Sequence, residues 1–288
     1  MAPPEGYLSS RLGTHRLAIG AGSCAVVFWG LAPTLAKWIA LDGWSLAFYR
    51  MWLGAAVNLI LLYLRGGRLT REGVRASIPG GLALAIDCTL FFIAVKLTTI
   101  SNAVVIAALI PVPVLAVAPW MFGERLKWHD LGWVAVTLSG VALVVYGSSG
   151  TPHWSPTGDL VAFASMLAFA AYFIASKRAR QSTGTLEYQS AIMFVGAIAV
   201  TPAALLFGRG LVISSAQVAL GVVMMAIVPN IGHILMNWAH AHLQLWVAAT
   251  LTSTMPVVAA VAALAVFGEP IVPWQVAGIL VVVVGGVK

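Results

Sequence analysis

The sequence predicts an all-α integral membrane protein with ten transmembrane helices, arranged as two inverted five-helix repeats. Three observations lead to this prediction: the apolar composition, the length and number of the apolar runs, and a duplication of half the chain. Of the 288 residues, 60% are hydrophobic and only 9% are charged, with a mean hydropathy of +0.95. A soluble protein of this size needs many more charges to cover its surface.

Apolar runs of about twenty residues, the length that crosses a bilayer as a helix, alternate with short polar breaks. We expect ten spans, at residues 16–40, 44–64, 77–98, 101–122, 128–148, 157–177, 186–207, 214–239, 243–267 and 270–287. The first run is too long for a secretory signal peptide, so we interpret it as the first span. A transmembrane β-barrel would show alternating polarity in shorter segments, a pattern that is absent.

Half of the chain repeats. Pro111 is followed by an apolar run that ends in Phe122-Gly123-Glu124, and Pro256, 145 residues later, by one that ends in Phe267-Gly268-Glu269. The same shift pairs Leu90 with Leu235, Ala94 with Ala239, Ala103 with Ala248 and Gly140 with Gly285. A fixed offset of this kind indicates one duplicated unit. We therefore predict a first five-helix repeat over residues 1–149 and a second, inverted one over residues 150–288, joined by a Gly/Ser/Pro-rich linker.

The placement of lysine and arginine predicts the orientation. With a cytoplasmic N-terminus, twelve of these residues fall on the inside and four, Lys37, Arg50, Lys96 and Arg209, fall near the outside. Both termini are therefore expected in the cytoplasm. Because each repeat holds five spans, the second starts on the opposite side of the membrane, which inverts it relative to the first. Inverted repeats recur in secondary transporters; a scaffold or a membrane-embedded enzyme is the alternative.

Several motifs carry a family resemblance. They are Trp29-Gly30 and Lys37 in the first span, Tyr49-Arg50 opening the second, Asn237-Trp238-Ala239 in the eighth, and the two Pro…Phe-Gly-Glu stretches. With these motifs the chain resembles the EamA-type branch of the drug/metabolite transporter superfamily over essentially its whole length. The resemblance implies a ten-helix exporter of small metabolites, commonly amino acids, or of drugs, usually in a bacterial inner membrane. Pro33 departs from the small polar residues frequent in the first span of the family, and it predicts a kink there.

The eighth span has the most informative polar pattern. Asn230, His233, Asn237 and His240 follow one another at steps of three, four and three, so a helix places them along one stripe. Because polar groups are costly in a membrane, we expect such a stripe to line a cavity. The alternative is a helix–helix contact held by side-chain hydrogen bonds.

Asp87 is a carboxylate near the middle of a span. The 145-residue shift aligns it with Gly232, and aligns Cys88 with His233. We therefore expect Asp87 and His233 to lie near each other around the cavity, where Asp87 attracts a substrate ammonium or takes a proton and His233 titrates near neutral pH. The alternative is a neutral, protonated Asp87 that is hydrogen-bonded inside its own repeat.

Aromatic and hydroxyl side chains complete the predicted cavity. Trp29 and Tyr172 lie deep in their spans, where an aromatic ring either packs in the core or stacks on a substrate; we predict the second role. Thr250 and Thr254 lie in the ninth span at positions whose counterparts in the first repeat are apolar, and Ser165 shares a face of the sixth span with Tyr172. Five further tryptophans lie near span ends, as an interfacial belt predicts: Trp38, Trp44, Trp120, Trp128 and Trp274.

Structural roles are predicted for the repeated motif. Glu124 and Glu269 open the helices that follow them, so we interpret both as helix caps. Pro111 and Pro256 free backbone carbonyls in the fourth and ninth spans, so we predict hinges there. Arg50 lies near an outer span end, where its side chain either extends toward the interface or pairs with a carboxylate or with the carboxyl group of the substrate; the first interpretation is the simpler one.

Motifs of enzymes and of ATP binding are missing from the sequence, as are a metal-ligand cluster and a cofactor signature. We therefore expect no enzyme activity, no cofactor, no metal and no nucleic-acid partner. The expected function is export of small amphiphilic metabolites, namely aromatic or apolar amino acids, by alternating access around a midplane cavity, with protons as a possible coupling ion. The alternatives are a multidrug exporter and a membrane-embedded enzyme. A monomer in the bacterial inner membrane is the expected form, with substrate and bilayer lipid as its partners.

Overall fold

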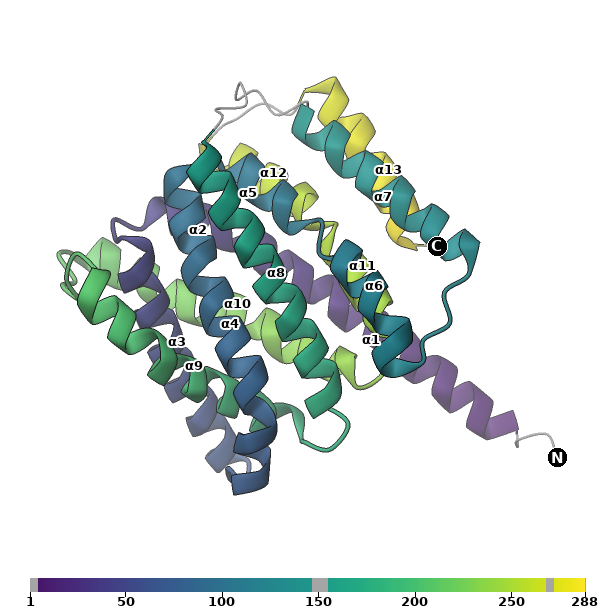
Figure 1. Cartoon of the computed structure of the whole chain (residues 1–288), viewed down its shortest axis with the longest axis horizontal. Coiled ribbons are helices and arrows are strands. Elements are labelled where there is room, and N and C mark those ends of the chain that lie inside the picture. The colour runs from purple at the N-terminus through teal and green to yellow at the C-terminus, as the bar shows by residue number, and fades with distance from the viewer. Residues whose placement is uncertain (1–4, 147–154, 268–271, 288) are drawn as a thin grey trace.

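The computed structural model describes residues 5–146, 155–267 and 272–287. Within these ranges every regular element is an α-helix (Figure 1). The helices are α1 (Glu5–Gly30), α2 (Ala32–Trp38), α3 (Gly43–Leu64), α4 (Arg71–Leu97), α5 (Ile100–Ala107), α6 (Pro111–Phe122), α7 (Trp128–Tyr146), α8 (Pro156–Ala179), α9 (Thr185–Phe207), α10 (Ala216–His240), α11 (Leu245–Thr252), α12 (Met255–Phe267) and α13 (Pro273–Val287).

Eight helical segments in the described ranges are long and apolar enough to cross a membrane. They coincide with eight of the ten predicted spans, and α7 and α13 lie where the other two are predicted. Large apolar side chains, such as Leu64, Leu206 and Phe207, are exposed on the outside of the bundle, as lipid contact requires. Trp120 and Trp128 are also highly exposed at helix ends, which fits the predicted interfacial positions.

Three of these membrane segments are interrupted helices. The first breaks at Leu31, two residues before Pro33, and so carries the predicted kink. The other breaks separate α5 from α6 and α11 from α12. Pro111 begins α6 and Pro256 is the second residue of α12, where a missing N–H costs no helical hydrogen bond. The repeated proline therefore marks the same break in both halves of the chain.

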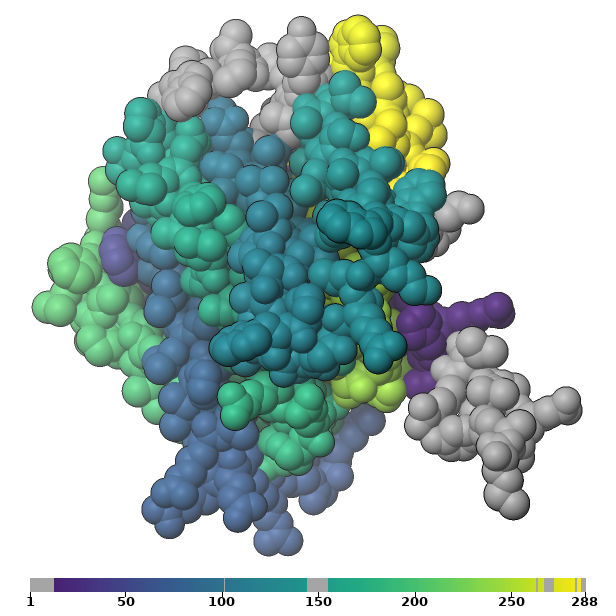
Figure 2. All heavy atoms as spheres, turned by 45° about the vertical axis from the view of Figure 1, so that its right-hand side comes forward, coloured from purple at the N-terminus to yellow at the C-terminus, as the bar shows by residue number. Residues whose placement is uncertain are grey.

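Contacts between helices of the two halves recur when each helix is replaced by its counterpart in the other half. Helix α1 packs against α10, and their counterparts under the 145-residue shift, α8 and α4, pack against each other. The contact of α6 with α11 recurs in the same way as that of α12 with α5, and two further contacts join a helix to its own counterpart: α3 with α9, and α7 with α13. Figure 2 shows the last pair, teal α7 and yellow α13, adjoining at one edge of the surface. Such an exchange is what a two-fold relation between the halves produces.

Two matched glycines bring α7 and α13 together. A Cβ atom added to Gly140 would lie 2.7 Å from the main-chain nitrogen of Val282, and one added to Gly285 would lie 2.4 Å from Oγ1 of Thr137. Gly140 and Gly285 correspond under the 145-residue shift, and so do Thr137 and Val282. The contact is therefore the same on both sides of the axis, and each side needs a residue without a side chain.

Candidate functional site

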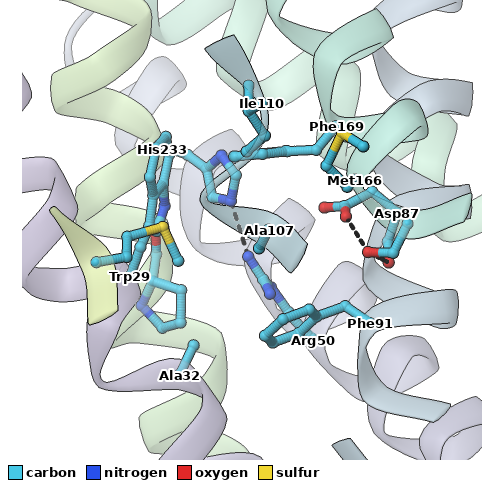
Figure 3. A pocket seen from close by; sticks show the side chains of 13 residues that line it. Trp29, Ala32, Arg50, Asp87, Phe91, Ala107, Ile110, Met166, Phe169 and His233 are labelled. Carbon is cyan, nitrogen blue, oxygen red and sulfur yellow. Dashed lines mark hydrogen bonds between the residues drawn. The ribbon is translucent and has the colours of Figure 1, made fainter. Parts of the chain in front are cut away.

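A cavity lies between the two halves of the molecule (Figure 3), and its lining includes residues beside the helix breaks, namely Ala32, Ile110 and Met255. Its volume between atoms is about 480 Å³, including the space at its mouth. The first repeat contributes lining residues from α1 to α5, and the second from α8, α10 and α12. The wall is mostly apolar and aromatic, and four residues bring polar groups into it: Arg50, Asp87, Ser165 and His233.

Arg50 is the cation of this cavity. Helix α3 begins at Gly43, so Arg50 lies about 10 Å along a membrane helix. Its side chain is 6% exposed, with the guanidinium carbon 5.5 Å from the ring centre of Phe92. Nη2 donates a hydrogen bond of 2.8 Å to Nε2 of His233 (Figure 3). The side chain therefore faces the cavity, which corrects the simpler prediction that it extends toward the membrane interface.

Hydrogen bonding fixes the tautomer of His233. A guanidinium only donates, so Nε2 of His233 must accept and the neutral ring carries its proton on Nδ1. Nδ1 then donates to the hydroxyl oxygen of Tyr172 at 3.1 Å, and that hydroxyl donates to Oδ1 of Asn237 at 2.9 Å. His233 and Tyr172 are 2% and 0% exposed, so both hydrogen bonds are shielded from water. The ring is thus held as an acceptor toward Arg50.

A row of buried amides continues from Asn237. Its Nδ2 donates to Oε1 of Gln189 at 2.7 Å, and Gln189 donates to Oδ1 of Asn230 at 2.8 Å. The same Asn230 oxygen accepts a 2.8 Å hydrogen bond from Asn58. The row joins α10 to α9 and α3, so it connects the two repeats through satisfied polar groups in the core.

Asp87 lies in the same cavity and has a different partner. Its Oδ1 accepts a hydrogen bond of 2.7 Å from the hydroxyl of Ser165 on α8. Among the described residues no ion pair joins Asp87 to Arg50, and no hydrogen bond joins it to His233. Asp87 and His233, which we predicted to be neighbours, therefore line one cavity without bonding to each other. Ser165 bonds to Asp87, and Arg50 bonds to His233.

Trp29 forms part of the apolar wall. Its indole nitrogen donates to the carbonyl oxygen of Pro229 at 3.2 Å, and its ring lies 5.3 Å from Phe169 and 4.8 Å from His233, between ring centres. The close approach of α1 to α10 at this point depends on Gly232, where a Cβ atom would lie 2.8 Å from the indole nitrogen of Trp29. With its N–H group already satisfied, Trp29 presents apolar surface to the cavity.

Four predicted site residues lie outside the cavity lining. Tyr172 and Asn237 are fully buried behind the wall, in the hydrogen-bonded chain of His233. The hydroxyls of Thr250 and Thr254 bond to carbonyl oxygens of their own helical segment, at Trp246 and Leu251. The stripe on α10 is therefore divided between one cavity residue, His233, two amides that bond to other helices, Asn230 and Asn237, and His240, whose buried ring nitrogens have no hydrogen-bond partner among the described residues.

Glu124 is a helix cap, although not of the helix that follows it. Its carboxylate accepts hydrogen bonds from the main-chain N–H groups of Leu245 at 2.5 Å and Trp246 at 3.3 Å, the first residues of α11. The cap therefore crosses from the first repeat to the second. Glu269 lies outside the described residues. Within the described ranges, no three His, Cys, Asp or Glu side chains gather as a metal site would require.

Comparisons with known proteins agree with this architecture. One solved structure, described only as the crystal structure of a protein, superimposes with a TM-score of 0.76 at 20% sequence identity, covering 93% of this chain and 94% of that one. No curated protein matches the sequence. The sequence pattern of the EamA-like transporter family matches twice, over residues 16–146 and 156–287, one match for each repeat. The chain therefore belongs to the EamA-like transporter family, whose members are multi-pass membrane transporters of small molecules.

Proposed function

We propose that the protein is a secondary transporter that exports small amphiphilic metabolites, with aromatic or apolar amino acids as the first candidates. The observation that supports this most directly is the cavity between the repeats, lined by helices of both halves. Its wall is apolar and aromatic, and it holds one cation, Arg50, and one carboxylate, Asp87. Sites of this size with a few placed polar groups suit small ligands that are partly apolar and partly charged.

Alternating access around this cavity is the mechanism that we propose. The exchange of helix contacts supports ten spans in two inverted repeats, so that each half takes the role of the other when the cavity changes sides. The breaks at Pro111 and Pro256 flank the cavity region, since Ile110 and Met255 line it. They are therefore suitable hinges for the movement of the outer parts of both helices.

The cellular setting is part of the same proposal. The surplus of lysine and arginine on one side supports a location of both termini in the cytoplasm, and the resemblance to EamA-type transporters supports a bacterial inner membrane. Because one chain encloses the cavity, a monomer suffices for transport. Proton coupling would require a group that exchanges protons with the cavity, and Asp87 is the candidate, because His233 is held as an acceptor by Arg50.

Flux measurements in proteoliposomes test the proposal. Purified protein is reconstituted, and uptake and efflux of labelled phenylalanine and leucine are followed with and without a pH gradient, beside protein-free liposomes. We expect saturable movement of at least one amino acid, with gradient dependence indicating proton coupling and its lack a uniporter. Movement of unrelated drugs without amino acids would identify a multidrug exporter instead. No movement of any candidate would contradict transport of amphiphilic metabolites.

A further inference from the structure

We propose that Arg50 and Asp87 are the two poles of a zwitterion site, in which Arg50 binds the carboxylate and Asp87, with Ser165, binds the ammonium group of one ligand. The inference deepens the proposed function, on which it rests for the role of the cavity. It concerns how the cavity recognises its ligand, and it assigns roles to two residues that the transport mechanism alone does not specify.

The carboxylate pole follows from the position of Arg50. Its guanidinium has five N–H donors in a planar fork, the geometry that binds a carboxylate through two parallel hydrogen bonds. Among the described residues His233 is its one hydrogen-bond partner, through Nη2, and no acidic side chain pairs with it. The charge is therefore buried without an anion in contact. A carboxylate entering the cavity supplies that anion.

The ammonium pole follows from Asp87 and Ser165. Ser165 donates its hydroxyl proton to Oδ1 of Asp87, which leaves Oδ2 of Asp87 and the lone pairs of the Ser165 oxygen as acceptors. Both residues line the cavity. An ammonium group has three donors and no acceptor, so it matches a site made of a carboxylate oxygen and a hydroxyl oxygen.

The separation of the poles selects for zwitterions. Arg50 and Asp87 lie in one cavity, yet they form no ion pair with each other. A ligand that carries one charge pairs one pole and leaves the other desolvated beside it, which is costly in a low-dielectric site. A ligand that carries both charges pairs both poles at once. Discrimination then comes from the pole that a singly charged analogue cannot satisfy.

The remaining wall accommodates the apolar part of such a ligand. Trp29, Phe91, Met166 and Phe169 surround the polar groups with aromatic and thioether surface (Figure 3). The side chain of the ligand is therefore expected to be apolar or aromatic, in agreement with the amino-acid proposal. A second charge on the ligand side chain would face this wall without a partner.

Three related compounds separate the contributions of the poles. Phenylalanine carries both charges, phenethylamine lacks the carboxylate, and 3-phenylpropanoate lacks the ammonium group. Binding of each to the purified full-length protein in detergent is measured by calorimetry, with thermal stabilisation as a second readout. We expect the wild-type protein to bind phenylalanine at least about tenfold tighter than either analogue.

Substitutions at the two poles should produce opposite patterns. Arg50→Gln is expected to abolish the preference for phenylalanine over phenethylamine while keeping its preference over 3-phenylpropanoate. Asp87→Asn is expected to abolish the preference for phenylalanine over 3-phenylpropanoate while keeping the preference over phenethylamine. Arg50→Lys and Asp87→Glu keep the charges, so they should retain weakened preferences and allow the test if a neutral variant does not fold. Arg209→Gln and Asp130→Asn, which remove charges away from the cavity, should leave both preferences unchanged.

Two outcomes would overturn the inference. One is an equal loss of affinity for all three compounds in both neutral variants, which indicates a structural role for these charges. The other is a wild-type protein that binds the analogues as tightly as phenylalanine, or binds none of them. Labelled phenylalanine flux in proteoliposomes distinguishes this result from failure of the proposed function. If labelled phenylalanine is still transported but the two neutral variants do not show the opposite binding patterns, the transporter proposal holds and the two-pole site is rejected.

Discussion

The hydroxyl of Ser253 donates a hydrogen bond of 2.8 Å to the carbonyl oxygen of Ala108, the residue that precedes it by 145 positions. The two residues occupy the same place in the two repeats, at the breaks between α5 and α6 and between α11 and α12. In a continuous helix Val112 would donate its N–H to the Ala108 carbonyl, but it donates to Leu109 instead. Ser253 therefore satisfies a carbonyl that the break sets free, and it joins the two breaks directly.

Ser253→Ala should destabilise the junction of the two breaks. Both residues are buried, so the substitution leaves the Ala108 carbonyl without its partner. We expect a loss of about 1–3 kcal/mol, measured as a lower midpoint of thermal unfolding in detergent. Thr254→Val is the matched control, because among the described residues the hydroxyl of Thr254 bonds only to Leu251, in the preceding turn. An unchanged midpoint for Ser253→Ala would show that the bond contributes nothing to stability.

Alanine at either matched glycine should separate α7 from α13. The added methyl group meets main-chain atoms of the partner helix at Gly140 and the side chain and main chain of Thr137 at Gly285, so backbone shifts costing about 1–3 kcal/mol are expected for each. Thermal unfolding measures the effect. Gly132→Ala, in the same helix α7 with no atom within 4 Å of the added Cβ, is the control and should not lower the midpoint. Equal behaviour at positions 140 and 132 would contradict the close contact.

The fold was largely predictable because its signals are local or repeated. Runs of apolar residues predict spans, and a proline with a fixed offset predicts the break in α5–α6 and its copy. Contacts between repeats are not local, so the sequence predicted a cap at Glu124 without indicating that it belongs to α11. The missing information is the contact between the helices of the two repeats, since α6 packs against α11 and Glu124, just after the end of α6, reaches the start of α11.

The candidate site was predictable in part for a related physical reason. A helix places polar residues on one stripe, but whether each faces a cavity or a neighbouring helix depends on what the neighbour carries. Tyr172 and Asn237 face each other because α8 and α10 meet there. Asn58 and Gln189, the amides that complete this row, were not predicted. Each of them is an uncharged polar residue inside an apolar span, the second and the seventh. Such a residue indicates a polar partner on a neighbouring helix, which here is Asn230 on α10.

His233→Gln and His233→Asn should differ in their effect on Arg50. A glutamine amide reaches the position of Nε2 and supplies an acceptor to Arg50, whereas an asparagine amide reaches the position of Nδ1 and bonds to Tyr172 alone. Because hydrogen bonds to charged groups contribute about 1.5–3 kcal/mol, we expect His233→Asn to weaken carboxylate binding strongly and His233→Gln only slightly. Calorimetric titration with phenylalanine measures this order. The reverse order would show that the contact with Tyr172 matters more than the contact with Arg50.

Glu124→Ala should weaken the start of α11. The carboxylate accepts two main-chain N–H groups at a buried helix N-terminus, and loss of such a cap costs about 0.5–2 kcal/mol. Glu124→Gln retains an acceptor oxygen and should recover part of the loss. Arg125→Ala, at the exposed neighbouring position, is the control. Unfolding midpoints in detergent decide the order, and a Glu124→Gln protein as unstable as Glu124→Ala would indicate that the negative charge, rather than the hydrogen bond, is required.

Asp42 should make stability depend on pH at the start of α3. Partial burial opposes its ionisation, but hydrogen bonds from Ser45 and from the main-chain N–H groups of Arg209 and Trp44 outweigh it and lower its pKa below the usual 3.8. A lowered pKa in the folded state contributes stability that is complete above about pH 5 and is lost as the pH falls through the folded-state value. Asp42→Ala should therefore cost about 1 kcal/mol at pH 7, and the difference from wild type should shrink below pH 4. Thermal unfolding across this pH range measures the effect, with Glu72→Ala as an exposed control. A difference between wild type and Asp42→Ala that stays constant with pH would contradict the proposed cap.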